Sequence, residues 1–226
     1  MAFRRSRFIE REILDDQTPD RAAPSLADIV RINRMLGGHE VLRKRLSTVV
    51  SPGEKFTLLD VGAGSGDAAD VVLNRFPNAS VFSLDYRAHH VRTARGNRIV
   101  GDAFRLPVKP RTFDIVYAGL FLHHFTDEQV VQLLRHMAVA AKRCVVINDL
   151  ERHVLPYYFL PATRWLLRWD PITLHDGTIS VQAAFTAPEM RSLADCAGLH
   201  DADVRTHRPS FRVSMVARVT DDKLRL

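Results

Sequence analysis

The feature that most constrains this chain of 226 residues is an apolar run that ends in an acid and is followed at once by three glycines. The run is Leu58–Val61, with Asp60 near its end, and the glycines occupy alternate positions of Gly62–Gly66. This pattern is typical of a buried strand that leads through a tight turn into a helix, because glycine lets the backbone approach a ligand that side chains would block. Asp85 ends the next apolar run, where a carboxylate can bind both hydroxyls of a ribose. The sequence therefore predicts a nucleoside site.

The spacing of the glycines distinguishes between classes of nucleotide. A dinucleotide site has the pattern G-x-G-x-x-G, which leaves a helix N-terminus open to a pyrophosphate. Here the pattern is G-x-G-x-G, and Asp67 stands where the third glycine of a dinucleotide site would be. A carboxylate there repels a pyrophosphate but is harmless to a cofactor that carries a sulfonium and an ammonium group. We therefore expect such a cofactor rather than a dinucleotide.

Together with the later segment Gly101–Ala103, these elements resemble class I S-adenosylmethionine-dependent methyltransferases over about residues 56–150. The resemblance implies an α/β fold with a Rossmann-like, seven-stranded, mostly parallel sheet and helices on both faces. It also implies N-terminal helices and a cap insertion after the fifth strand. The implied cofactor is S-adenosyl-L-methionine. For the glycine turn alone, a generic α/β turn is the alternative.

The resemblance also implies a set of cofactor contacts. The glycine turn is expected to line the amino-acid end of the cofactor, Asp85 to hold the ribose and Asp102 to meet the adenine amino group. Arg34 or Arg31, on an N-terminal helix, is expected to reach the cofactor carboxylate; the alternative is that these are exposed polar residues. The full expected set is Asp60, Gly62, Ala63, Gly64, Gly66, Asp85, Tyr86, Asp102, Ala103, Phe104, Gly119 and Arg34.

Candidate catalytic residues follow the fourth and fifth expected strands. Methyl transfer from a sulfonium is an in-line displacement, and the acceptor often has to lose a proton. His124 and His123 lie where the loop of this family faces the acceptor, and histidine titrates in the working range of pH. His175 and Asp149 are further candidates for the base. The alternatives are that both neighbouring histidines only pack and hydrogen-bond, and that His175 belongs to a polar turn. We expect no metal site.

The length fits a single α/β domain and is too short for two. We therefore expect residues 1–226 to form one methyltransferase domain. Its expected parts are an N-terminal helical lid segment (1–52), a cofactor-binding core (56–150), a substrate cap (151–186) and a C-terminal helix with strands (187–226).

Alternating apolar runs and helical stripes predict the elements of this domain. The expected strands are 56–61, 81–84, 98–100, 113–118 and 142–148, with a final antiparallel pair at 203–206 and 211–219. The expected helices are 8–14, 24–36, a helix ending at 50, 67–75, 89–96, 126–137 and 186–198. Two of them, at Thr126 and Thr186, begin with capping boxes.

The composition and charge limit the kinds of molecule that this chain is expected to bind and where it is expected to act. The net charge is +6, but the basic residues are scattered, so we expect a solvated basic surface and no nucleic-acid partner. No apolar run approaches the roughly 18 residues that span a bilayer, so we expect no membrane span. Met1–Arg7 begins like a signal peptide, but charged residues follow it, and we expect a cytoplasmic protein. Cys144 and Cys196 are expected to be buried free thiols. A homodimer is compatible with the sequence.

The favoured function is O-methylation of a small phenolic, enolic or polyketide-like acceptor, because histidines cluster where a base is required. Segments 31–38, 148–153 and 174–181 resemble bacterial methyltransferases that tailor polyketides in secondary metabolism. The alternatives are a C- or N-methyltransferase of a small molecule, an RNA methyltransferase and a non-catalytic cofactor-binding protein. Base N-methylation commonly uses a proline-containing turn after the fourth strand, and Ala118–Phe121 has no proline.

Overall fold

The computed structural model describes residues 3–219, with Asp15 described by its backbone. Residues 1–2 and 220–226, which belong to the expected segments 1–52 and 187–226, lie outside the described residues. The strands are β1 Phe56–Val61, β2 Ala79–Asp85, β3 Asn97–Val100, β4 Phe113–Gly119, β5 Ala141–Leu150, β6 Asp203–His207 and β7 Arg212–Arg218. The α-helices are α1 Pro19–Met35, α2 Gly38–Leu46, α3 Asp67–Arg75, α4 Asp127–Ala140, α5 Val154–Leu167, α6 Pro171–Ala183 and α7 Ala187–Cys196. The 3-10 turns are η1 Leu14–Asp16, η2 Val91–Thr93, η3 Ala103–Arg105 and η4 Leu122–His124.

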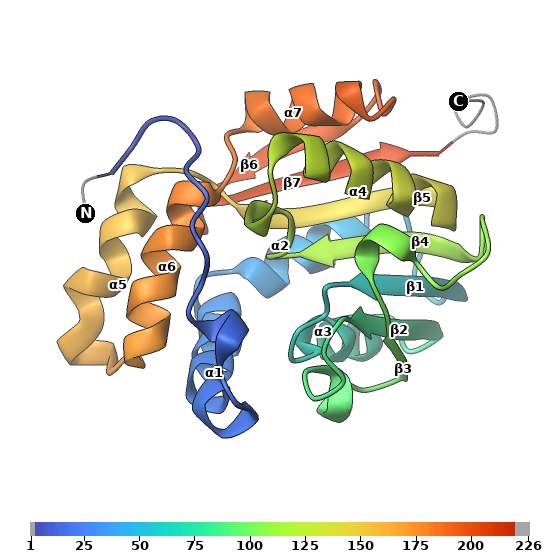
Figure 1. Ribbon diagram of the computed structural model, residues 1–226. Helices are drawn as coiled ribbons and strands as arrows, with labels where there is room; N and C mark the ends of the chain where they lie inside the picture. The colour runs from blue at the N-terminus through green and yellow to red at the C-terminus, as the bar shows by residue number, and fades with distance from the viewer. Residues whose placement is uncertain (1–2, 220–226) are drawn as a thin grey trace.

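One sheet contains all seven of these strands, in the order β3-β2-β1-β4-β5-β7-β6 (Figure 1). The strands from β3 to β5 pair in parallel, whereas β7 is antiparallel to both of its neighbours, β5 and β6. This arrangement confirms the expected Rossmann-like, mostly parallel sheet with helices on both faces. No helix among residues 3–219 is long and apolar enough to span a membrane.

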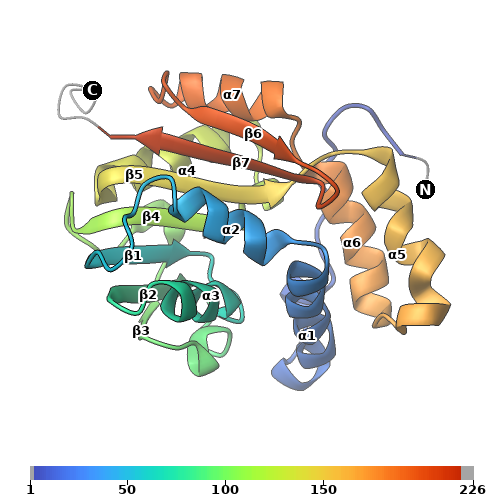
Figure 2. The ribbon, with the colours of Figure 1, turned by 180° about the vertical axis from the view of Figure 1, so that it is seen from behind.

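Alternating side chains of the strands build a core on each face of the sheet. Leu59 and Val116 belong to the core that α4 and α7 cover. Their neighbours Leu58 and Ile115 belong to the opposite core, which α2 and α3 cover (Figure 2). Because the strands are buried on both faces, they read as nearly continuous apolar runs.

The helices α1, α5 and α6 lie together beyond the carboxyl ends of the parallel strands (Figure 1). Polar contacts join them: the Asp28 carboxylate accepts a hydrogen bond from Asp170 N at 2.7 Å. Arg31 donates to the Leu167 carbonyl at 2.8 Å and stacks on the Trp169 ring at 4.0 Å. Of these helices, α5 and α6 form the expected insertion after the fifth strand, and α1 is one of the expected N-terminal helices.

Residues 3–13, which we call the strap, run as an extended segment past α6 (Figure 1). Phe8 N donates to the Gln182 carbonyl at 3.2 Å. Farther along, Ile13 N and Leu14 N donate to the Asp176 carboxylate at 3.0 and 2.8 Å. The expected helix at 8–14 is therefore wrong, because these backbone groups hydrogen-bond to α6 instead of to one another.

Four other local expectations need correction. The helix expected to begin at Pro24 begins at Pro19, whose missing N–H costs nothing in the first turn. The expected helix at 89–96 is reduced to the single turn η2. The helix expected to end at Val50 ends at Leu46, and Cys196 is exposed rather than buried. The alternative of a polar turn at His175 is wrong as well, because His175 lies inside α6.

We predict that Asp176→Ala releases the strap from α6, because two backbone N–H donors lose their acceptor. The free energy of unfolding should fall by about 1–3 kcal/mol, the cost of buried polar groups left unpaired. Limited proteolysis and hydrogen exchange should show new exposure within residues 3–16. Thr178→Ala is the matched control, since that hydroxyl bonds the His175 carbonyl within the same helix. A strap that stays protected in Asp176→Ala would contradict this account.

Candidate active site

A cavity of about 1240 Å³ opens at the carboxyl edge of the sheet, between the strand ends and α1, α5 and α6. Pockets for one small ligand usually have roughly 300–1,000 Å³. The cavity therefore has room for two ligands side by side. Its walls include the glycine turn on one side and the η4 loop on the other.

The glycine turn has left-handed backbone at each of its glycines, with φ of +71° at Gly62, +52° at Gly64 and +77° at Gly66. A Cβ at Gly62 would lie 2.1 Å from the Phe121 ring, and one at Gly66 would lie 2.3 Å from Ala94 Cβ. A Cβ at Gly64 would meet nothing within 4 Å. Gly62 and Gly66 are thus required for packing and backbone conformation, whereas Gly64 presents bare backbone to open space.

Asp85, at the end of β2, stands beside this turn. Its carboxylate accepts hydrogen bonds from Gly64 N at 3.0 Å and Arg87 N at 2.9 Å, and His90 Nδ1 lies 3.2 Å away. Burial raises the pKa of Asp85, but these hydrogen bonds outweigh burial and hold the pKa below its ordinary value. The group is an oriented carboxylate at the cavity wall, as a ribose contact requires.

The segment after β3 supplies the next part of the wall. The Asp102 carboxylate accepts a hydrogen bond from Phe104 N at 2.8 Å, which caps η3. Ala103 is buried, and the Phe104 ring packs edge-on against Phe125 at 5.3 Å. Tyr86 is exposed at the opening. Asp102, Ala103, Phe104 and Tyr86 all line the cavity, next to the glycine turn.

Two further acids lie near the turn. Asp60 is buried beneath it, and burial, followed by the charges of Asp67 and Asp85, raises its pKa well above the ordinary value. Asp67 lines the cavity, and its carboxylate meets His39 Nε2 at 2.7 Å and Asn33 Nδ2 at 3.1 Å. Burial raises the pKa of Asp67, but these contacts outweigh burial and lower it. The cavity therefore has a negative wall at this end.

At the other end, His123 is held by an ion pair. Its Nδ1 lies 2.6 Å from Asp149 Oδ1, and both side chains are almost completely buried. Burial lowers the pKa of His123, but the Asp149 carboxylate, aided by Glu12, outweighs burial and raises the pKa to about 9. Burial raises the pKa of Asp149, and His123 lowers it to about 2. His123 is therefore a cation at neutral pH.

Glu12 is a residue of this site that the sequence analysis missed. The strap carries it into the cavity wall, where its Oε1 lies 3.8 Å from His123 Nε2 and 3.7 Å from His124 Nδ1. The Ser180 hydroxyl of α6 also donates to it. Burial raises the pKa of Glu12, but His123, His124 and Ser180 lower it to about 2. No sequence motif marks this residue, because its partners are far away along the chain.

The three side chains of Glu12, His123 and His124 form what we call the acid–base cluster. One ligand atom from each lies within 4.8 Å of the others, a geometry that a metal ion could also use. His124 is the most accessible of the three, with 29% of its side chain exposed, and it lines the cavity. The cluster can therefore exchange a proton with a molecule in the cavity.

The structure does not bring every expected residue to the cavity. His175 points away on α6, with 46% of its side chain exposed and its Nδ1 2.9 Å from Asp176.

Arg34 is exposed outside the cavity wall. On the same helix, Asn33 takes the inward position and joins Asp67 to Arg212. Gly119 lines the cavity, whereas Gly66 lies against Ala94 and Asp149 contacts His123, and neither of these two lines the cavity.

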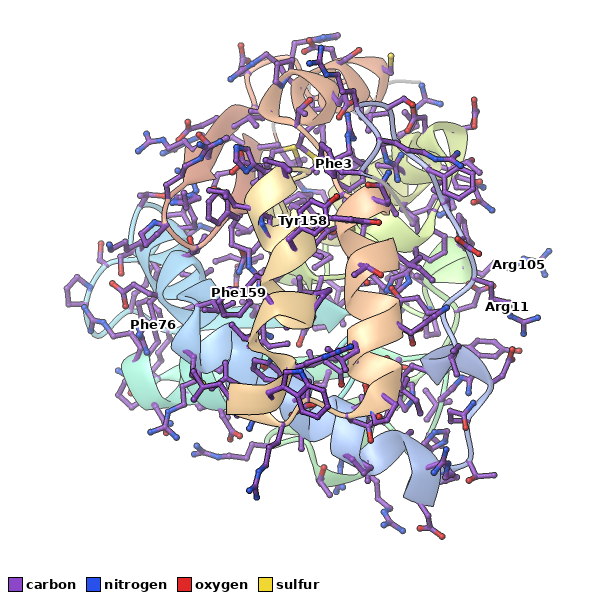
Figure 3. All side chains as sticks on the ribbon, turned by 90° about the vertical axis from the view of Figure 1, so that its left-hand side faces the viewer. Phe3, Arg11, Phe76, Arg105, Tyr158 and Phe159 are labelled. Carbon is purple, nitrogen blue, oxygen red and sulfur yellow. The ribbon has the colours of Figure 1, made fainter. Side chains whose placement is uncertain are left out.

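The aromatic segment of α5 divides between the cavity and the surface. Phe159 and Leu160 line the cavity, and Tyr157 is buried. Tyr158 is half exposed, and Figure 3 shows it leaving α5 in a different direction from Phe159. The cavity wall next to the acid–base cluster is therefore largely apolar.

Comparison with known proteins adds to this geometry. Residues 58–143 match a family described as a methyltransferase domain. The chain is 32% identical over 99 residues to a malonyl-[acyl-carrier protein] O-methyltransferase of Xylella fastidiosa, covering 39% of this chain and 34% of that protein. It is 26% identical over 148 residues to a demethylmenaquinone methyltransferase of Thermotoga maritima, covering 62% and 65%. The chain thus spans about one third and just under two thirds of the length of these two relatives.

Among solved structures, the plantazolicin methyltransferase BamL, in complex with a triazolic desmethylPZN analog and SAH, superposes with a TM-score of 0.66. The superposition covers 89% of this chain and 90% of BamL, at 13% sequence identity. At that identity the likeness shows a shared fold. The matched segment begins inside β1 and holds the glycine turn, Asp85, Asp102 and the η4 loop, which line one part of the cavity. The match to the methyltransferase domain family therefore includes the sheet side of the cavity.

Proposed function

We propose that this protein transfers a methyl group from S-adenosyl-L-methionine to an oxygen atom of a small, largely apolar molecule. The observation that carries the proposal is the single cavity that joins the glycine turn and Asp85 to the acid–base cluster. We further propose that residues 1–226 work as one domain, with the segment 1–52 as a lid and 151–186 as the acceptor cap. Polyketide-like molecules fit the apolar wall, and we propose a role in secondary metabolism.

The cofactor side has the groups that S-adenosyl-L-methionine requires. Gly64 leaves open space for the amino-acid end, and the Asp85 carboxylate at the cavity wall is an acceptor for the ribose hydroxyls in this proposal. Asp67 adds a negative charge that suits an ammonium or a sulfonium group and opposes a pyrophosphate. The residues present therefore fit this cofactor, which supplies an activated methyl group when bound.

The acceptor side has a group that can take a proton. In the proposed reaction an acceptor oxygen attacks the methyl carbon, the bond from sulfur to that carbon breaks, and S-adenosylhomocysteine leaves. The hydroxyl proton passes to His124, whose cationic form Glu12 then stabilises at 3.7 Å. His123 is already protonated, so it serves as a fixed charge that orients Glu12 and the loop. Methylation of an enolised carbon would use the same groups.

The proposal is tested by calorimetric titration with S-adenosylmethionine, S-adenosylhomocysteine and NADH. We expect the first two to bind and NADH not to bind. Asp85→Ala should weaken S-adenosylhomocysteine binding by about tenfold or more, since hydrogen bonds to a charged group contribute roughly 1.5–3 kcal/mol. Asp70→Ala, which removes an exposed carboxylate of α3, is the matched control. Binding of NADH alone would refute the proposed reaction.

For the proton acceptor, we predict that His124→Ala lowers kcat by about a hundredfold or more, the usual contribution of a positioned general base. Binding of S-adenosylhomocysteine should stay close to that of the unchanged protein. The assay uses labelled S-adenosylmethionine with a panel of phenolic and polyketide-like acceptors. His200→Ala, at an exposed histidine beyond α7, should leave the rate unchanged. An equal rate in His124→Ala would remove His124 from the reaction.

The His123–Asp149 pair predicts a pH dependence of stability. The folded pKa of His123 lies above the ordinary 6.5, so its contribution is complete below about pH 6.5 and is lost as the pH rises through about 9. We expect the free energy of unfolding to fall by about 2–3 kcal/mol over this interval, measured by urea denaturation. The double variant H123Q/D149N keeps polar side chains without the charges and should lack this decline. A decline of the same size in the double variant would assign it to other groups.

A further inference from the structure

The outer face of α5 carries an unusual concentration of exposed apolar side chains. Trp165 and Leu166 are 82% and 81% exposed, the highest values among the large apolar residues of the described chain. They lie in line with exposed apolar residues that begin at the N-terminus of α5. The exposed apolar residues of the helix are Val154, Leu155, Tyr158, Trp165 and Leu166, which we call the α5 patch. Exposed apolar side chains that form one contiguous patch mark an interaction surface.

The exposed charged residues within α5 and directly after it are basic. Within α5 the sequence has no Asp or Glu, and its one charged residue, Arg164, lies exposed beside Trp165, over whose ring its guanidinium stacks at 4.8 Å. Arg168 follows directly and is exposed. On the strap, Arg4 and Arg5 are exposed next to Phe3, whose ring packs on Tyr157 of α5 at 5.6 Å. The patch is thus apolar with a basic border.

The opposite side of the same helix faces the cavity. Pro156, Phe159 and Leu160 line the cavity from α5. Leu155 belongs to both surfaces, because it lines the cavity and is also exposed. The α5 patch therefore reaches the rim of the cavity, so a surface bound at the patch lies next to the opening.

We propose that the α5 patch docks this protein on a membrane surface that carries anionic lipid headgroups. A helix with an apolar face and arginines at its polar border lies in the plane of the interface, with its apolar side chains at the acyl boundary. Tryptophan is enriched at that depth, because its ring is apolar and its N–H can meet water. Arg164 and Arg168 then contact lipid phosphates, and an apolar acceptor can pass from the bilayer to the cavity past Leu155.

The charges favour a membrane over a second copy of the chain. In a two-fold symmetric dimer the same patch would face itself, and Arg164 and Arg168 would approach their own copies. Like charges brought together at an interface are unfavourable, whereas anionic headgroups neutralise them. Membrane docking goes beyond the proposed function and does not depend on methyl transfer.

The test is flotation of the full chain with vesicles of phosphatidylcholine alone and of phosphatidylcholine mixed with phosphatidylglycerol. We expect binding to the mixed vesicles, with a blue shift of tryptophan fluorescence from the exposed Trp165, since Trp169 is already buried. The double variant W165E/L166E should bind the mixed vesicles at least about tenfold more weakly, because two large apolar side chains no longer enter the bilayer. Val139→Glu is the matched control, at an exposed apolar residue near the far end of α4.

Circular dichroism and titration with S-adenosylhomocysteine accompany each variant. Unchanged cofactor binding in W165E/L166E shows that loss of flotation comes from the surface and not from a damaged site. Failure of the unchanged protein to bind the mixed vesicles would overturn the docking proposal while leaving the proposed reaction untouched. Equal binding by W165E/L166E would also overturn it. So would a dimer in size-exclusion chromatography that the double variant abolishes, because the patch would then join two copies.

Discussion

The change in strand order between β1 and β4 is the constraint on which the rest of this structure depends. From β1 the sheet grows through β2 and β3 on one side and through β4 and β5 on the other. The connections that leave the carboxyl ends of β1 and β4 therefore diverge and open a crevice between them. The glycine turn follows β1 and the η4 loop follows β4, so the two ends of the cavity are fixed by topology before any cap is added.

The parts of the site that the sequence could predict are those set by neighbours a few residues apart. The glycine turn opens α3 at Asp67, and the capping boxes form at Thr126 and Thr186 as expected. Asp85 and Asp102 line one cavity because Asp85 ends β2 and Asp102 follows β3, and parallel strands end at the same edge of the sheet. The spacing of apolar residues and the identity of the turn residues suffice to predict these elements, because the hydrogen bonds involved are local.

The remainder depends on contacts between residues far apart in sequence. Residues 8–14 have enough apolar and charged residues to suggest a helix, yet Ile13 and Leu14 donate to Asp176 of α6. Glu12 therefore enters the acid–base cluster through an extended segment that no local pattern marks. Sequence also placed His175 near the acceptor, although the rotation of α6 turns Asp176 inward and leaves His175 half exposed. Packing against the rest of the protein decides which face of a cap helix points into the cavity. A short polar segment of sequence does not predict that orientation.

His123 and His124 show how far surroundings decide chemistry when residue type and sequence position are almost the same. His123 lies buried between two carboxylates, which keeps it protonated and unable to accept a proton at neutral pH. His124 lines the cavity, and its Nδ1 lies 3.7 Å from Glu12 Oε1. Glu12 arrives only with the strap, and the strap is fixed by Asp176 and Gln182 of α6. The side of the cavity at the glycine turn thus belongs to the sheet, whereas the side at the acid–base cluster is complete only when the strap and the helices α5 and α6 are packed together.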